Sequence, residues 1–188
     1  RAVLEIGCGT GNDAVRFVDA GARYTGIDLT DAAVKITKAR IGDKGAVFKT
    51  NAEFLDFPDD YYDLVYSFGV IHHAINPENI IREAHRVLRP SGGIYIMLYN
   101  KFCFRYLIEI LILRKILWYL HHPKFDDIRK HIPHPTKDQW LSMNTDTIGC
   151  PLSRVYTKKT ATTLLKDFRF VTSDTFNFGW FRVVRGIK

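Results

Sequence analysis

Short apolar runs alternate with amphipathic stretches through the first hundred residues. The runs have strand length, and the stretches between them repeat their apolar positions at helical spacing. The pattern predicts strands over 3–6, 22–27, 46–49, 63–67 and 94–99, and helices over 13–19, 31–40 and 77–88. Strands that alternate with helices indicate a parallel sheet covered by helices on both faces.

Residues at the helix ends support these boundaries. Gly21 is expected to close the first helix, and Thr30 to cap the second with Asp31 in its first turn. Asn76 is expected to cap the third helix, ahead of Pro77. The residues at the predicted helix ends are therefore of the types that begin and end helices.

Residues 101–155 break the alternation. The stretch 102–120 is very apolar but contains four charged residues, which argues against a membrane span. We expect a helical lid over the site, with contact to a membrane surface or a partner if the apolar face is exposed. The stretch 123–151 is predicted to be polar and rich in loops.

The alternation resumes after this insertion. We predict a helix over 157–168 capped by Thr157, then strands over 170–176 and 181–187. The chain is interpreted as a single domain, with a cofactor half (1–100), a lid and substrate insertion (101–155) and a C-terminal helix with strands (156–188).

A glycine-rich turn follows the first strand. Gly7, Gly9 and Gly11 let the backbone approach a ligand closely, and the helix that follows favours a carboxylate or phosphate at its N-terminus. A dinucleotide fingerprint, G-x-G-x-x-G, would need glycine in place of Asn12. Glycines required only for packing are the alternative.

The pattern Glu5-x-Gly7-x-Gly9-x-Gly11 resembles motif I of the class I S-adenosylmethionine-dependent methyltransferases. The resemblance implies a Rossmann-like α/β sheet, mostly parallel with an antiparallel last strand. It also implies that S-adenosylmethionine is the cofactor. The turn, including Cys8, would hold the amino-acid end of the cofactor, with Glu5 beneath it.

Asp28 ends the second strand, 17 residues after Gly11. A carboxylate there can accept hydrogen bonds from both hydroxyls of a ribose. Leu29 would then lie against the adenine. An aspartate that only caps the next helix is the alternative, and Thr30 already fits that role.

Asn51-Ala52-Glu53 follows the third strand, where many relatives have Asp-Ala-Glu meeting the adenine edge. Asn51 departs from that pattern, although an amide can both donate and accept hydrogen bonds. By the resemblance, these three residues and Ser67 belong to the cofactor site.

The segment from Ser67 to His73 resembles motif IV of the type-11 methyltransferase family, which includes quinone-ring C-methyltransferases. Ile71 replaces a leucine common there. The segment 86–93 resembles the R-x-L-K-P-G-G turn of that family. The resemblance covers 1–100 well and 157–188 loosely, and leaves 101–155 unmatched.

Two histidines are candidate catalytic residues. Transfer of a methyl group from a sulfonium needs an aligned nucleophile and exclusion of water. A general base is needed only when the acceptor must lose a proton, and His72 or His73 can serve. Packing and structural hydrogen bonding are the alternative roles. Substrate contacts are expected from Tyr99, Asn100 and Tyr156.

Charge and composition limit the function classes. The net charge is +7, with 11 basic and 13 acidic residues in 1–100 against 16 and 7 in 101–188. A basic second half suits an anionic substrate, a membrane surface or nucleic acid, and a solvated lysine-rich surface is the alternative. The Asp/Asn-Pro-Pro-Tyr/Phe motif of base N-methylating enzymes does not follow the fourth strand, so nucleic acid is the weaker hypothesis. A non-catalytic membrane-peripheral ligand-binding module is a further alternative.

The cysteine and histidine content predicts neither a disulfide framework nor a metal site. Three scattered cysteines favour a reducing, cytoplasmic setting. The spacings of the histidines in the insertion match no zinc module, although acidic residues and a cysteine lie nearby in sequence. This group is His121, His122, His131 and His134, with Asp126, Asp127 and Cys150.

Overall fold

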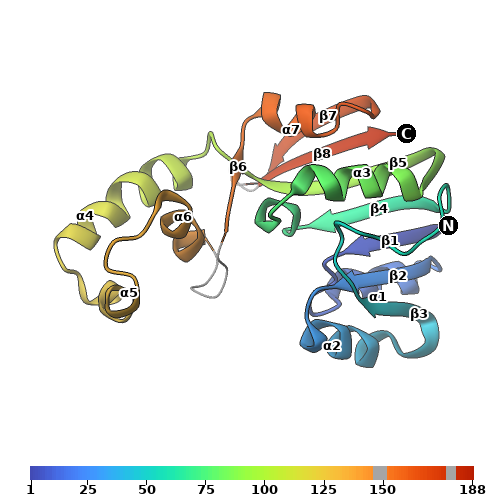
Figure 1. Cartoon of the computed structure of the whole chain (residues 1–188), viewed down its shortest axis with the longest axis horizontal. Helices are drawn as coiled ribbons and strands as arrows, with labels where there is room; N and C mark the ends of the chain where they lie inside the picture. The colour runs from blue at the N-terminus through green and yellow to red at the C-terminus, as the bar shows by residue number, and fades with distance from the viewer. Residues whose placement is uncertain (146–151, 177–180) are drawn as a thin grey trace.

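The computed structural model describes residues 1–145, 152–176 and 181–188, and it joins a sheet domain to a projecting group of helices (Figure 1). Its strands are β1 (Ala2–Ile6), β2 (Arg23–Asp28), β3 (Gly45–Lys49), β4 (Tyr62–Phe68), β5 (Leu88–Asn100), β6 (Val155–Tyr156), β7 (Arg169–Phe176) and β8 (Phe181–Ile187). Its helices are α1 (Asn12–Asp19), α2 (Asp31–Ile41), α3 (Pro77–Val87), α4 (Arg114–Tyr119), α5 (Asp126–His131), α6 (Lys137–Thr145) and α7 (Lys158–Leu164). Short 3₁₀ turns are η1 (Gly42–Lys44), η2 (Ile71–His73) and η4 (Pro123–Phe125), and η3 (Arg105–Leu113) is a π-helix.

The strands form one sheet in the order β3-β2-β1-β4-β5-β8-β7, with β6 paired to β5 off this path. The strands β1 to β5 run parallel, and β8 runs antiparallel to both β5 and β7. The predicted sheet, including its antiparallel last strand, is confirmed. Because the strand order reverses at β1, the carboxyl ends of β1 and β4 flank the crevice where open α/β sheets bind ligands.

Helices cover both faces of the sheet. The apolar side chains of α1 and α2 pack with Cys8, Tyr24 and Val47 on one face. On the other face, α3 and α7 bury Ile81 and Ala161 against the larger core. The amphipathic pattern of the sequence therefore places each helix on its sheet face.

Most of the predicted helix ends are correct. Thr30 Oγ1 accepts a hydrogen bond from the Ala33 amide, and Thr157 forms a capping box with Thr160. Gly21 ends α1 with a φ of 75°. Asn76 takes the predicted N-cap position ahead of Pro77, but its side chain makes no capping hydrogen bond and instead donates to Glu53 Oε2 at 2.9 Å.

Residues 102–145 form a helical lobe that projects from the carboxyl end of β5 (Figure 1). The prediction of loops after residue 123 is wrong for the described part, since α5 and α6 lie there. Their contacts explain the difference: the rings of Trp118, Phe125 and Trp140 pack together at centroid distances of 5.5–6.2 Å. Such short helices depend on tertiary packing rather than on local propensity.

The strand β5 is longer than predicted. It begins at Leu88 rather than at residue 94, because the Arg89-Pro90-Ser91-Gly92 segment continues beside β4 through an irregularity in the register. Among the described residues, no helix combines the length and the apolar character needed to cross a bilayer.

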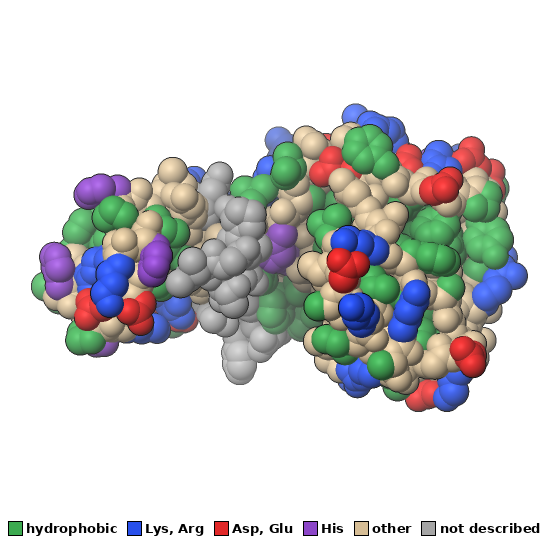
Figure 2. All heavy atoms as spheres, turned by 60° about the horizontal axis from the view of Figure 1, so that its bottom comes forward, with side chains coloured by type: hydrophobic (Ala, Val, Ile, Leu, Met, Phe, Trp, Pro, Cys, Tyr) green, Lys and Arg blue, Asp and Glu red, His purple; other side chains and the backbone are tan. Residues whose placement is uncertain are grey.

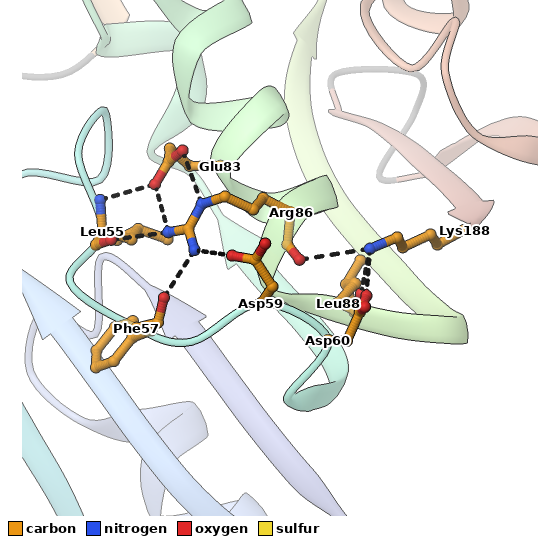
Figure 3. A network of polar contacts seen from close by, with 8 residues as sticks. All are labelled: Leu55, Phe57, Asp59, Asp60, Glu83, Arg86, Leu88 and Lys188. Atoms are coloured by element: carbon orange, nitrogen blue, oxygen red, sulfur yellow. Dashed lines mark hydrogen bonds and ion pairs between the residues drawn. The ribbon is translucent and has the colours of Figure 1, made fainter.

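Arg86 on α3 fixes the loop that leads into β4 (Figure 3). Its guanidinium donates to the carbonyls of Leu55 and Phe57 at 2.8 and 2.7 Å, and pairs with Asp59 and Glu83. These contacts hold the pKa of Glu83 below its usual range. The Arg86 side chain thus donates hydrogen bonds to several acceptors in a loop that is distant from it in sequence.

We expect Arg86→Ala to lower the free energy of unfolding by about 2–3 kcal/mol, because it leaves two carbonyls without their donor and Glu83 without its ion-pair partner. Urea unfolding measures the effect. The control is Lys130→Ala, which removes an exposed ion pair with Asp127 and should change stability by less than about 0.5 kcal/mol. Equal midpoints for the two variants would contradict this account of the loop.

Candidate functional site

The glycine turn after β1 has open space beside Gly9, its middle glycine. Gly7, Gly9 and Gly11 have φ values of 79°, 53° and 75°, a region that favours glycine. A β-carbon at Gly7 would lie 2.2 Å from Val70 Cγ2, and one at Gly11 would lie 3.1 Å from Thr37 Cα. A β-carbon at Gly9 would meet no atom of the described residues within 4 Å. The turn is therefore packed at both ends and open in its middle.

The helix α2 holds the outer side of this turn. Thr37 Oγ1 donates to the Gly9 carbonyl at 3.1 Å, and Arg40 Nη1 donates to the Thr10 carbonyl at 2.6 Å. Neither residue was identified from the sequence, because each lies about thirty positions from its partner and belongs to no motif. These two contacts fix the carbonyls on the α2 side of the turn.

Glu5 is buried beneath the turn and accepts a hydrogen bond from the Tyr24 hydroxyl at 2.5 Å. Burial, together with the nearby Asp13 and Asp28 carboxylates, raises the pKa of Glu5 to about 7 against the lowering effect of the Tyr24 hydrogen bond. Three carboxyl groups therefore share one corner, which favours a positively charged ligand over an anion.

The raised pKa of Glu5 makes stability depend on pH. An unfolded glutamate loses its proton near ~4.3, whereas Glu5 in the folded chain keeps its proton to about 7. Between these values the unfolded chain binds fewer protons, so the free energy of unfolding falls as the pH rises. Above about 7 both states are ionised and this dependence ends.

We expect Glu5→Gln to remove that dependence, because glutamine stays neutral and its oxygen can still accept from Tyr24. Relative to the unchanged chain, the variant should gain up to about 3 kcal/mol between pH 4.5 and pH 7.5. Urea unfolding of both proteins at the two pH values measures the gain. A difference that is the same at both pH values would show that Glu5 ionises normally.

Asp28 joins the turn to the end of β2. Its Oδ2 accepts from the Gly9 amide at 3.1 Å, and its Oδ1 accepts from the amide and hydroxyl of Thr30 at 2.9 Å each. Leu29 beside it is 65% exposed, which is unusual for a large apolar residue at a strand end. The carboxylate and an apolar surface thus lie together at the open middle of the turn.

The other predicted cofactor residues differ in their surroundings. Asn51 is exposed and its Oδ1 accepts from the Glu53 amide, while Ala52 is buried. The Glu53 carboxylate accepts two hydrogen bonds from Asn76, which hold the pKa of Glu53 below its usual range.

Two further predicted residues are buried. Cys8 lies in the core under α1, and burial raises the pKa of its thiol. Ser67 is fully buried and donates to the Ile6 carbonyl at 3.1 Å, which links β4 to β1. Contact of either residue with a cofactor stays a prediction, and for Cys8 it would involve the backbone.

The two histidines lie with Tyr99 at the carboxyl ends of β4 and β5. The His72 ring is fully buried, with its centroid 3.9 Å from that of Tyr99 and 4.1 Å from that of His73. His73 is half-buried, and its Nδ1 lies 2.7 Å from the Leu152 carbonyl oxygen. A carbonyl can only accept, so Nδ1 carries the proton and Nε2 is the nitrogen that can take one up.

Asn100 and Tyr156 are both buried and are paired between β5 and β6. Asn100 Oδ1 accepts from Arg182 Nη2 at 3.0 Å, and its amide group donates to the Phe102 carbonyl. Sequence reasoning missed Arg182, whose partner is 82 positions away. This buried pair fixes the point at which the chain leaves the sheet for the lobe.

A separate cavity of about 430 Å³ lies within the helical lobe, between α4 and the segment that leads into α6. Aromatic side chains of Tyr106, Trp118 and Trp140 line it. Among the described residues, no three histidine, cysteine or acidic side chains form a group that could hold a metal ion. Cys150 lies outside the described residues.

Two known methyltransferases are similar in sequence to this chain. The chain is 34% identical over 96 residues to a 27-O-demethylrifamycin SV methyltransferase of Amycolatopsis mediterranei. The aligned region covers 48% of this chain and 35% of that protein. The chain is also 32% identical over 108 residues to a ubiquinone/menaquinone biosynthesis C-methyltransferase of Shewanella sediminis, which covers 53% and 43%. The chain therefore spans less than half the length of either relative.

A solved S-adenosylmethionine-dependent methyltransferase from Methanosarcina mazei shares the fold. It superposes with a TM-score of 0.69 at 21% identity and covers 100% of this chain and 92% of that one. The model of the methyltransferase domain family matches residues 4–96, which include the glycine turn, Asp28 and both histidines. Residues 4–96 belong to the class I S-adenosylmethionine-dependent methyltransferases of the type-11 family, whose cofactor is S-adenosylmethionine.

Proposed function

We propose that this chain binds S-adenosylmethionine at the glycine turn and transfers its methyl group to a small-molecule acceptor with an apolar part. One observation carries the proposal. The open middle of the turn, the Asp28 carboxylate and the pair of His73 and Tyr99 all lie at the carboxyl edge of β1, β2, β4 and β5.

The proposed cofactor position uses the groups at this corner. The amino-acid end lies in the glycine turn above Glu5, the ribose hydroxyls donate to Asp28, and the adenine lies between Leu29 and Asn51. S-adenosylmethionine carries positive charge at its sulfonium and its ammonium, which complements the carboxylates of Asp13 and Asp28 beside Glu5. A dinucleotide pyrophosphate would be repelled by the same groups.

The transfer is an in-line displacement. A lone pair of the acceptor forms the new bond to the methyl carbon, and the carbon–sulfur bond breaks with its electron pair left on sulfur. Where the acceptor also loses a proton, His73 Nε2 takes it. His72, buried between His73 and Tyr99, packs the base in place.

The surroundings of Tyr99 support an apolar part in the acceptor. Tyr99 belongs to an apolar cluster that continues into the helical lobe through Cys103 and Tyr106, with Phe181 packed against it. The relatives named above are a methyltransferase of 27-O-demethylrifamycin SV and one of ubiquinone/menaquinone biosynthesis, and neither name refers to a nucleic acid.

The experiment follows a labelled methyl group from S-adenosylmethionine into two pools, an ultrafiltered small-molecule extract and purified RNA. We expect label in the part of the small-molecule pool that partitions into organic solvent. His73→Gln should slow the transfer without weakening cofactor binding. Label that enters only RNA would replace this proposal with a nucleic-acid methyltransferase.

A further inference from the structure

The long helix of the lobe, η3 with α4, has two unlike faces. Its inner face is buried against α5 and α6 through Tyr106, Ile110 and Trp118, and Trp140 Nε1 donates to the Ile110 carbonyl at 3.1 Å. Figure 1 shows this helix on the outer side of the lobe. Its other face therefore has no described helix or strand packed over it.

That outer face is apolar and exposed. Exposed large apolar residues recur there at every fourth position, with three more beside them: Phe104, Ile108, Ile112, Ile116 and Leu120, with Leu107, Leu113 and Tyr119. The inner residues 106, 110 and 118 fall between them at the same spacing. A contiguous apolar face of this length is unusual on a protein that contacts only water.

The lobe is basic overall, with seven basic and four acidic residues over 102–145. Three of the four acidic residues of the lobe, Glu109, Asp126 and Asp127, pair with Arg114, Arg129 and Lys130. Four exposed lysines form no ion pair with any described residue: Lys101, Lys115, Lys124 and Lys137. Figure 2 shows the underside of the lobe, where basic, acidic and histidine side chains lie together.

We propose that the outer face of η3 and α4 docks on the surface of an anionic lipid bilayer. An interfacial helix of this kind buries its apolar face at the boundary between headgroups and acyl chains, and lysines at its margin attract anionic headgroups. The helix lies on the membrane and does not cross it, because it carries the charged residues Glu109, Arg114 and Lys115. The proposal concerns the lobe surface alone and does not depend on methyl transfer.

A second copy of the chain fits the outer face less well. A two-fold contact would place the same patch against itself and bring Lys115 of α4 toward the Lys115 of the other copy. The acidic residue of the same helix, Glu109, already pairs with Arg114. Anionic headgroups supply a compensating negative charge.

The test is sedimentation of the full chain with vesicles of phosphatidylcholine alone or mixed with phosphatidylglycerol. We expect binding to the mixed vesicles, at least ten-fold weaker binding to phosphatidylcholine, and weaker binding in high salt because the charges are screened. Ile112→Asp with Ile116→Asp should reduce binding at least ten-fold.

Ile36→Asp on α2 is the matched control. Ile36 is 45% exposed, against 48% and 49% for Ile112 and Ile116, so the same change should leave vesicle binding as it is. Ile116→Trp gives a second readout, because a tryptophan that enters the interface should shift its emission to shorter wavelength when mixed vesicles are added.

Three outcomes would overturn the proposal. They are no binding to mixed vesicles, equal binding by the double variant, or a dimer without vesicles that the double variant abolishes. The last would assign the outer face to self-association. Binding of S-adenosylmethionine, measured on the same samples, separates each of these outcomes from failure of the proposed function.

Discussion

Asp28→Ala should weaken S-adenosylmethionine binding by at least about 100-fold. In the proposed complex the carboxylate accepts charge-assisted hydrogen bonds from two ribose hydroxyls, each worth roughly 1.5–3 kcal/mol. It also accepts from the Gly9 amide at 3.1 Å, so its loss loosens the turn that holds the other end of the cofactor. Titration calorimetry of both proteins measures the loss.

Two variants separate the ribose contact from other effects. Asp28→Asn keeps an acceptor oxygen but loses the charge, and should weaken binding by about 10-fold. Asp31→Ala removes an exposed carboxylate three positions away that pairs with Lys49 at 2.6 Å, and should leave binding unchanged. If Asp28→Ala binds as tightly as Asp31→Ala, the ribose does not lie at Asp28.

Gly9→Ala should weaken cofactor binding by at least about 10-fold, because its methyl group would occupy the space proposed for the cofactor. The change also strains the backbone at a φ of 53°, at a cost of about 1–2 kcal/mol in stability. The binding loss has to be separated from this strain.

Gly21→Ala supplies that separation. Gly21 has a φ of 75°, and a β-carbon there also meets no described atom within 4 Å, but it lies at the end of α1. Both variants should lose similar stability in urea unfolding, and only Gly9→Ala should lose affinity. Equal affinity in the two variants would mean that the open space at Gly9 is not where the cofactor binds.

Local signals predicted the conformation of the glycine turn and the start of α2, because each signal acts within a few residues. The glycines of the turn and the Thr30 cap need only their own neighbours to take their conformation. The supports of the turn were not predictable in this way. Thr37 and Arg40 reach the turn only after α2 has packed beside it.

The errors in prediction have the same cause. Asn76 has the sequence context of a helix cap, but the fold brings Glu53 within reach and its side chain donates there instead. The helices α5 and α6 are six and nine residues long, and the aromatic cluster of the lobe stabilises them. A sequence pattern shows only the conformational preferences of neighbouring residues. The hydrogen bond of Asn76 and the formation of α5 and α6 depend on contacts between residues that are distant in the chain.

The most direct test of the central claim is a calorimetric titration of this chain with S-adenosylmethionine and, separately, with NAD. Three positive-φ glycines above a buried Glu5, beside Asp28, predict one saturable site for S-adenosylmethionine and no detectable binding of NAD. A folded chain that binds NAD and not S-adenosylmethionine would contradict the account.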